Sequence, residues 1–142
     1  MYKRQYYDAL GKDDDLYVLA RAIQFYAPGI PQVYYMGLLA EPNDMVLLES
    51  TNIGRNINRH YFSEREAQES LERPVVKRLI ALMNHRNSCP AFDGSFNLKY
   101  EGAILKLKWE NGDMNSVLIV DFESLTFKID ERVNDQVETL RF

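Results

Sequence analysis

Apolar residues in the first part of the chain recur at helical spacing. They follow three consecutive aspartates, Asp13 to Asp15, which suit the start of a helix because its dipole favours negative charge there. The apolar positions on one helical face are Leu16, Leu19, Ala20, Ile23 and Ala27. Pro28 and Gly29 cannot continue the helix. The pattern therefore predicts a helix over residues 13–27.

Residues 30–36 form a short, almost wholly apolar run, "IPQVYYM". Such a run is typical of a parallel strand that is covered on both faces. A single parallel strand cannot form a sheet by itself, so this strand requires neighbours. The rest of the chain contains no second segment of this kind. The run therefore predicts that the chain is a piece of a larger protein.

Two further helices are predicted between residues 63 and 88. Ser63 and Glu66 form a capping-box pattern, and a short helix should continue to about Leu71. Pro74 suits the first position of the second helix. This helix has a broad apolar face, made of Val75, Val76, Leu79, Ile80, Leu82 and Met83. The stretch "NSCPAFDG" closes it.

The period changes to two after about residue 94. Leu105, Leu107 and Trp109 alternate with Lys106 and Lys108. The same alternation is found in Phe96, Leu98, Tyr100 and in Leu125, Phe127, Ile129. Gly102 and "NGD" at 111–113 indicate tight hairpin turns. We predict an antiparallel meander of four or five strands, and an α+β fold with its seam near Asp93.

Composition and charge exclude several classes of protein. The chain has 142 residues, is 46% hydrophobic and carries a net charge of −4 with both signs interspersed. This argues against a nucleic-acid binder, which usually shows a basic face. There is neither an apolar run that could span a membrane nor the apolar core of a signal peptide. The lone Cys89 is read as a packing residue in a cytoplasmic protein.

One loop gathers many directional hydrogen-bond donors. It is "STNIGRNINRHYF", from Ser50 to Phe62, and it contains Arg55, Arg59 and His60 together with several amides and hydroxyls. A solvated linker would use Gly, Ser, Pro and Lys more freely. The loop therefore favours binding of a polar neutral ligand or an anion.

Four segments resemble the sucrose phosphorylases, retaining transglucosidases of the α-amylase clan within glycoside hydrolase family 13. They are "YYDALG" (6–11), "ARAIQFYAPGIPQVYYMGLLA" (20–40), "GRNINRHYF" (54–62) and "RPVVKRLIALMNHRN" (73–87). The resemblance implies the last helix-strand-helix portion of a (β/α)8 barrel over residues 1–93, holding its seventh helix, eighth strand and eighth helix. It also implies a small antiparallel β domain over residues 94–142.

The resemblance assigns a role to Arg55. Active sites of such barrels lie in the loops after the strands, and Arg55 lies in the loop after the eighth strand. In the family, the arginine of the "GR" pair helps to hold the glucosyl unit in the donor subsite. Its planar fork suits adjacent sugar hydroxyls and a carboxylate. Arg59 and His60 inherit no role, and we read them as a structural loop network.

Retaining chemistry needs a carboxylate nucleophile and a carboxylic acid. The resemblance places both on earlier barrel strands, so we expect no catalytic residue in this chain and no activity of the chain alone. Asp13 to Asp15 are read as a helix cap. The other acidic residues considered match no catalytic position: Glu41, Asp44 and Glu49 near the loop, and Glu64, Glu66, Glu69 and Glu72 on a solvated helix face. His60 and His85 are too few for a metal site, and no cofactor is expected.

Three interpretations remain open. The first is the C-terminal part of an enzyme that transfers glucose from sucrose to phosphate. The second is a non-catalytic interaction domain that self-associates or complements a separate N-terminal half. The third is a related phosphorylase that acts on sucrose 6-phosphate or glucosylglycerate. The start "MYKRQ" departs from the family pattern, so we read Met1 as a start inside an ancestral gene or a designed cut. The stretch "AEPND" (40–44) also departs from that pattern, which changes the charge and stiffness of its loop. No nucleic-acid or membrane partner is expected.

Overall fold

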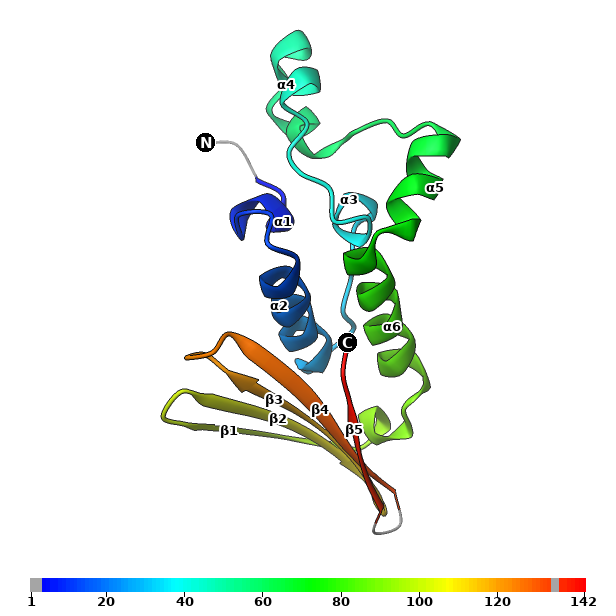
Figure 1. The fold of residues 1–142 in the computed structure, drawn as a ribbon. Helices are drawn as coiled ribbons and strands as arrows, with labels where there is room; N and C mark the ends of the chain where they lie inside the picture. The colour runs from blue at the N-terminus through cyan, green and yellow to red at the C-terminus, as the bar shows by residue number, and fades with distance from the viewer. Residues whose placement is uncertain (1–3, 134–135) are drawn as a thin grey trace. The chain divides into compact units, whose positions relative to one another are not determined.

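The computed structural model describes residues 4–133 and 136–142 (Figure 1). Residues 1–3 of the start "MYKRQ" lie outside the described residues, and so does the expectation about them. The chain divides into two compact units. The first unit holds the described residues up to Tyr17 together with Gln32–Ile80, and the second holds Val18–Pro31 and Ala81–Phe142. Helices α2 (Asp14–Tyr26) and α6 (Pro74–Ser88) contribute residues to both.

The first unit is built from short helices. They are α1 (Tyr6–Ala9), α3 (Tyr35–Leu38), α4 (Met45–Thr51), the 3-10 helix η1 (Gly54–Asn58) and α5 (Glu64–Glu72), with the first residues of α2 and α6. The predicted caps are confirmed. Asp13 Oδ1 accepts a hydrogen bond from the Leu16 N–H over 2.9 Å. Ser63 and Glu66 form a complete capping box at the start of α5.

Aromatic and aliphatic side chains form the core of the first unit. Tyr17 is fully buried, and its hydroxyl donates to the Gly37 carbonyl over 2.5 Å. The Tyr7 ring meets the Tyr17 ring edge-on at 5.2 Å. Of the predicted apolar face of α6, Val75, Val76 and Leu79 are buried here, whereas Ile80 is half-buried. The other buried apolar residues of this unit are Met36, Leu39, Ala40, Leu48 and Ile57.

The helix predicted over 13–27 is present, but its buried side is broader than the predicted face. Leu19 is buried as expected, whereas Ala27 is exposed. The most buried side chains of α2 are Tyr17, Val18, Ala22, Phe25 and Tyr26. Large aromatic residues therefore carry the burial, and the aliphatic positions 16, 20 and 23 lie at its margin.

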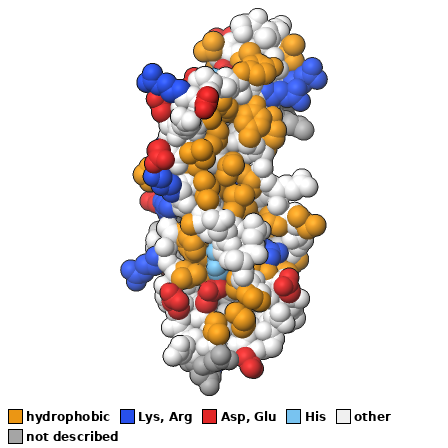
Figure 2. Space-filling model, turned by 90° about the vertical axis from the view of Figure 1, so that its right-hand side faces the viewer, with side chains coloured by type: hydrophobic (Ala, Val, Ile, Leu, Met, Phe, Trp, Pro, Cys, Tyr) orange, Lys and Arg blue, Asp and Glu red, His pale blue; other side chains and the backbone are white. Residues whose placement is uncertain are grey.

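Residues 30–36 correct the prediction of a buried parallel strand. Tyr34 keeps an extended backbone, but it joins no sheet, and the chain enters helix α3 at Tyr35. Ile30 is 92% exposed and Tyr34 52% exposed, while Met36 is fully buried. A parallel strand forms only where neighbouring strands supply its hydrogen bonds, and the described residues offer none beside this segment. Figure 2 shows, in orange, further hydrophobic side chains at the surface.

The second unit holds the predicted antiparallel meander. Its strands are β1 (Ser95–Glu101), β2 (Ile104–Asn111), β3 (Met114–Asp121), β4 (Thr126–Val133) and β5 (Gln136–Leu140), paired in chain order (Figure 1). The hairpin turns fall where glycine predicted them. Gly102 and Gly112 adopt φ of 59° and 57°, which glycine reaches without steric cost. The prediction of four or five strands is thus confirmed with five.

One face of the sheet is buried as the alternation predicted. Leu107 is 3% and Trp109 8% exposed, while Leu105 is half-buried. Trp109 Nε1 donates to the Tyr26 carbonyl oxygen at the end of α2 over 2.8 Å. The short 3-10 helix η2 (Pro90–Asp93) adds Ala91 and Phe92 to this core. The face is less well covered on β1, where the side chains of Leu98 and Tyr100 are exposed.

Gly94 marks the entry to the sheet. A Cβ at this position would lie 1.8 Å from the Glu110 carbonyl oxygen, so only glycine allows the backbone of β2 to pass so closely.

Within residues 4–133 and 136–142, no helix combines the length and the apolarity that crossing a bilayer requires.

Candidate functional site

Asp44 closes the loop that carries the hydrogen-bond donors. Its Oδ1 accepts from the Leu47 N–H over 2.8 Å and caps helix α4. Its Oδ2 lies 2.7 Å from His60 Nδ1, and its backbone N–H donates to the Ile57 carbonyl over 2.8 Å. One aspartate thus joins both ends of the segment, and the buried Ile57 anchors its middle.

The segment from Ser50 to Phe62 is more ordered than the loop predicted from sequence. Ser50 and Thr51 belong to helix α4, which ends at Asn52 in the left-handed conformation, φ 51°. Residues 54–58 form the 3-10 helix η1. Asn56 Nδ2 donates to Thr51 Oγ1 over 2.9 Å and ties the two helices together. Several polar side chains of the loop therefore hold the loop itself.

Arg55 lies on η1, directly after Gly54, and its side chain is exposed. Among the described residues, no hydrogen bond or ion pair is found for its guanidinium. A charged fork without a partner, on a loop that Asp44 holds closed, is available to a ligand. The assignment of Arg55 to a sugar site stays a prediction.

His60 belongs to a network within the first unit. Besides Asp44, its ring faces Glu66 Oε1 at 3.9 Å and meets the Phe62 ring edge-on at 4.6 Å. The Tyr35 hydroxyl donates to the His60 carbonyl over 3.0 Å. These contacts agree with the structural reading of His60. Arg59 is exposed, and its charge opposes the burial that raises the pKa of the nearby Tyr35.

Arg73 bonds to several partners at once, and we call this group of contacts the Arg73 hub. The sequence did not single out this residue. Its Nη1 donates to the carbonyl oxygens of Leu39 and Ala40 and to Glu41 Oε1, over 3.1, 3.2 and 3.2 Å. Its Nη2 reaches the Tyr7 hydroxyl at 3.4 Å. A planar fork of donors is the group that can serve several acceptors at once.

Most acidic residues near the loop have structural partners. Glu41 pairs with Arg73 and accepts from the Ser70 hydroxyl over 2.8 Å. Asp14 accepts from the Tyr7 hydroxyl over 2.7 Å. The remaining pairs are Asp15 with Arg78, Glu69 with Arg65 and Glu72 with Lys77. Glu49 is exposed.

Tyr7 and Asp44 are among the described groups of the first unit whose pKa values are shifted. Burial and the hydrogen bond to Asp14 raise the pKa of Tyr7 to about 12. For Asp44, burial acts to raise the pKa, but the Leu47 N–H and His60 outweigh it and hold the pKa below the usual range. Asp44 is therefore ionised at neutral pH and suits its capping role.

A second polar cluster lies in the second unit. Cys89 Sγ donates to Glu131 Oε1 over 3.0 Å, and His85 Nδ1 lies 3.6 Å from the same oxygen. His85 Nε2 lies 2.9 Å from the Tyr26 hydroxyl, which lies 2.6 Å from Ser116 Oγ. Burial lowers the pKa of His85, despite Glu131, and burial with the Glu131 hydrogen bond raises that of Cys89 to about 11.

Sequence reasoning missed this cluster. The spacing of His85 and Cys89, four residues apart at the end of α6, was the available signal. Glu131 lies 42 positions after Cys89, and only the fold brings it there. Cys89 is half-buried, which agrees with its reading as a packing residue.

Comparison with known proteins identifies close relatives. The chain is 53% identical to a sucrose phosphorylase from Agrobacterium vitis over 118 residues, which are 82% of this chain and 24% of that protein. It is 48% identical to a glucosylglycerol phosphorylase from Marinobacter adhaerens over 125 residues, 87% of this chain and 26% of that protein. No family model matches the chain.

A solved structure matches as well. The crystal structure of sucrose 6F-phosphate phosphorylase from Thermoanaerobacter thermosaccharolyticum superposes with a TM-score of 0.94 at 40% identity. The match covers 98% of this chain and 29% of that one. The chain thus spans about a quarter of the length of the relatives it matches.

Proposed function

Since this chain belongs to the sucrose phosphorylase family within glycoside hydrolase family 13, we propose that it forms the C-terminal end of a barrel enzyme that transfers glucose. Residues 1–93 would supply the last helices of the barrel and the segment of its eighth strand. Residues 94–142 would form the C-terminal β domain, and the start of β1 at Ser95 supports this boundary.

The reaction we propose for the whole enzyme is transfer of a glucosyl unit from sucrose to phosphate with retention. The name of the Agrobacterium vitis relative supports sucrose as the donor. Sucrose 6-phosphate and glucosylglycerate stay as alternatives, because relatives named for these substrates also match the chain. We propose a cytoplasmic enzyme without a cofactor.

Arg55 is the residue of this chain that we propose touches the sugar. The observation that carries this is its exposed, unpartnered guanidinium on η1, beside a loop that Asp44 closes with both its carboxylate and its backbone. Hydrogen bonds from a charged donor are worth about 1.5–3 kcal/mol each, so a bidentate contact would contribute strongly to donor binding.

The nucleophile and the acid of the reaction would come from earlier barrel strands. Asp13, Asp14, Glu41, Asp44 and Glu66 are held in caps, hydrogen bonds or ion pairs, which supports this division. Retaining chemistry requires two carboxyl groups about 5–5.5 Å apart that flank the scissile bond, one as nucleophile and one as acid. The 142-residue chain by itself should therefore release no glucose 1-phosphate from sucrose and phosphate.

One observation also favours a role in association with another chain. Ile30 is 92% and Val46 80% exposed, and leaving apolar surface in water costs about 25 cal/mol per Å². The extended backbone near Tyr34 could pair with another strand. A separately supplied N-terminal portion would cover these residues, and so would a second copy of the chain.

The test is a chimaera. The C-terminal quarter of the Agrobacterium vitis enzyme is replaced by this chain, and phosphorolysis of sucrose is measured. We expect activity within about tenfold of the intact enzyme, and none from the isolated chain. A folded chimaera without activity would contradict the proposal, as would turnover by the isolated chain that follows it through purification.

A further inference from the structure

His85, Cys89 and Glu131 bring three different metal-binding groups together. A ring nitrogen, the thiol sulfur and a carboxylate oxygen all lie within 4.8 Å of one another. Within the described part of the chain, this is the one group of three that meets such a limit. In a tetrahedral zinc site, bond lengths of about 2.0–2.3 Å place the ligand atoms about 3.3–3.6 Å apart. The observed 3.0 and 3.6 Å separations from Glu131 Oε1 are close to this range.

The imidazole of His85 is already oriented for such a role. Its Nε2 lies 2.9 Å from the Tyr26 hydroxyl, which leaves Nδ1 facing Glu131. The Tyr26 hydroxyl in turn lies 2.6 Å from Ser116 Oγ, and Ser116 is fully buried. A metal-bound histidine usually donates its second ring N–H to an oxygen, which fixes the tautomer and the ring plane. Tyr26 supplies that oxygen here.

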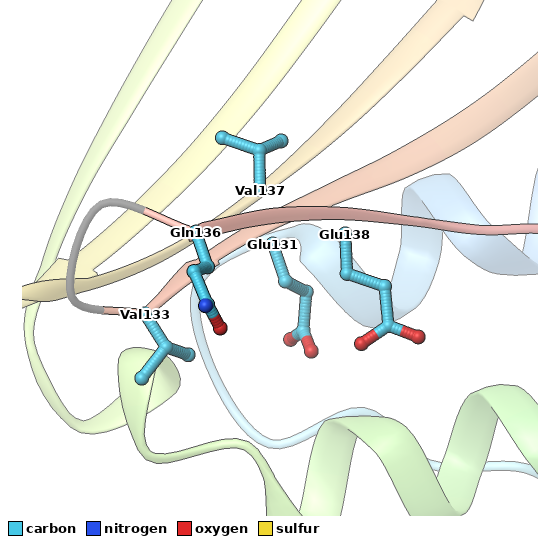
Figure 3. Close-up of a pocket in the computed structure, with 5 residues that line it drawn as sticks. All are labelled: Glu131, Val133, Gln136, Val137 and Glu138. Atoms are coloured by element: carbon cyan, nitrogen blue, oxygen red, sulfur yellow. The ribbon is translucent and has the colours of Figure 1, made fainter.

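A pair of carboxylates lies across the neighbouring strands. Glu131 of β4 and Glu138 of β5 are direct partners in the register, and Figure 3 shows both carboxylates on one side of the pair, with Val137 on the other. Like charges directly opposite each other are destabilising, and a bound cation would relieve this. The two glutamates also line a pocket of about 450 Å³, and 23% of the Glu131 side chain is exposed.

From these contacts we propose that His85 Nδ1, Cys89 Sγ and Glu131 bind a divalent transition-metal ion of the zinc class. Thiolate and imidazole together favour zinc or cobalt over the hard cations magnesium and calcium, which prefer oxygen ligands. On binding, the thiol proton leaves to solvent and the sulfur bonds to the metal as thiolate. The pocket beside Glu138 gives the ion a path and leaves room for a water as fourth ligand.

The site goes beyond the proposed function, because it lies in the second unit and uses none of the residues near Arg55. The three ligands come from the end of α6, from the residue that follows it and from β4. An ion there would join the end of the last long helix to the sheet. A bound ion should therefore raise the stability of the second unit.

The test uses the 142-residue chain with cobalt and zinc salts. We expect one equivalent of Co²⁺ to bind with a thiolate-to-cobalt charge-transfer band and tetrahedral d–d bands, and Zn²⁺ to displace it. Cys89→Ser, a near-isosteric change, should abolish the charge-transfer band and weaken Zn²⁺ binding at least tenfold. Glu131→Gln should weaken binding while keeping the band. Zn²⁺ should raise the melting temperature of the parent and not that of Cys89→Ser.

His60→Gln is the matched control, because it removes the other histidine, in the first unit, and should leave metal binding unchanged. Circular dichroism first confirms that each variant is folded. Equal Zn²⁺ affinity of the parent and Cys89→Ser would overturn the proposal. So would a cobalt spectrum without the charge-transfer band, or loss of binding in His60→Gln.

Discussion

Trp109 Nε1 donates a hydrogen bond to the backbone carbonyl oxygen of Tyr26 over 2.8 Å, although the two residues are 83 positions apart. The carbonyl belongs to the last turn of α2, where helix oxygens lack partners within the helix. The indole therefore completes a helix end and, with the same ring, fills the core beneath the sheet. The Tyr26 ring packs edge-on against Phe92 at 5.0 Å in the same core.

Trp109→Phe should destabilise the second unit through this bond. The phenyl ring keeps most of the apolar contact but leaves the buried Tyr26 carbonyl without its donor. An unsatisfied buried group costs about 1–3 kcal/mol, in addition to some lost packing. Urea unfolding followed by far-ultraviolet circular dichroism measures the cost. A free energy of unfolding equal to that of the parent would show that the bond adds nothing in solution.

Leu107→Asp should unfold the β meander. Leu107 is 3% exposed, and an unpaired carboxylate at such a position costs more than about 3 kcal/mol. Leu98→Asp is the matched control, because Leu98 is the direct cross-strand partner of Leu107 yet is 55% exposed. Thermal melts should show a large loss for the first variant and a small one for the second. Similar melts for both would show that the difference in burial between the two positions does not set the cost of the charge.

Local sequence signals predicted the parts of this fold that depend on near neighbours. Ser63 and Glu66 lie three residues apart and cap α5 without help from elsewhere. Gly102 and Gly112 set two hairpins for the same reason. The strand predicted at residues 30–36 needed distant partners; instead Ile30 and Tyr34 are exposed and the chain enters helix α3 at Tyr35.

The candidate sites divide in the same way. Arg55 was found because a short motif surrounds it, and its environment could be predicted as a loop but not as the end of two short helices. The hub at Arg73 joins Tyr7, Leu39, Ala40 and Glu41. Glu131 contacts Cys89 only when β4 is paired within the sheet. Such contacts depend on tertiary packing, which residue spacing does not encode.

Acid should weaken the first unit through Asp44. Its pKa is lower in the folded chain than in the unfolded one, so the stabilisation is complete above the unfolded value of about 3.9 and is lost as the pH falls through the folded value. Asp44→Asn keeps a good cap without the charge. The stability difference between parent and variant should therefore shrink as the pH falls from about 5 toward 2. Urea midpoints across this range measure it, and a difference independent of pH would contradict the assignment.

Arg73→Lys should destabilise the isolated chain. Lysine keeps the charge but cannot reach the Leu39 and Ala40 carbonyls, Glu41 and Tyr7 together. Acceptors left unsatisfied should cost about 1–3 kcal/mol. Differential scanning calorimetry measures the change against Arg55→Lys, which removes the fork of an exposed arginine. Equal melting temperatures for the two variants would show that the hub does not contribute to stability.

Arg55→Lys separates a role in binding from a role in folding. In the isolated chain Arg55 is exposed, so the melting temperature should not change and sucrose should bind too weakly to detect by calorimetry. In the active chimaera the same change should lower kcat/KM for sucrose at least about tenfold, because loss of one charge-assisted bond exceeds the 1.4 kcal/mol that a factor of ten requires. Arg59→Lys, at an exposed arginine four residues further along the loop, is the control and should change the rate little. A chimaera indifferent to Arg55→Lys would remove Arg55 from the sugar site. Equal losses for both arginines would assign the effect to the charge of the loop instead of the fork at position 55.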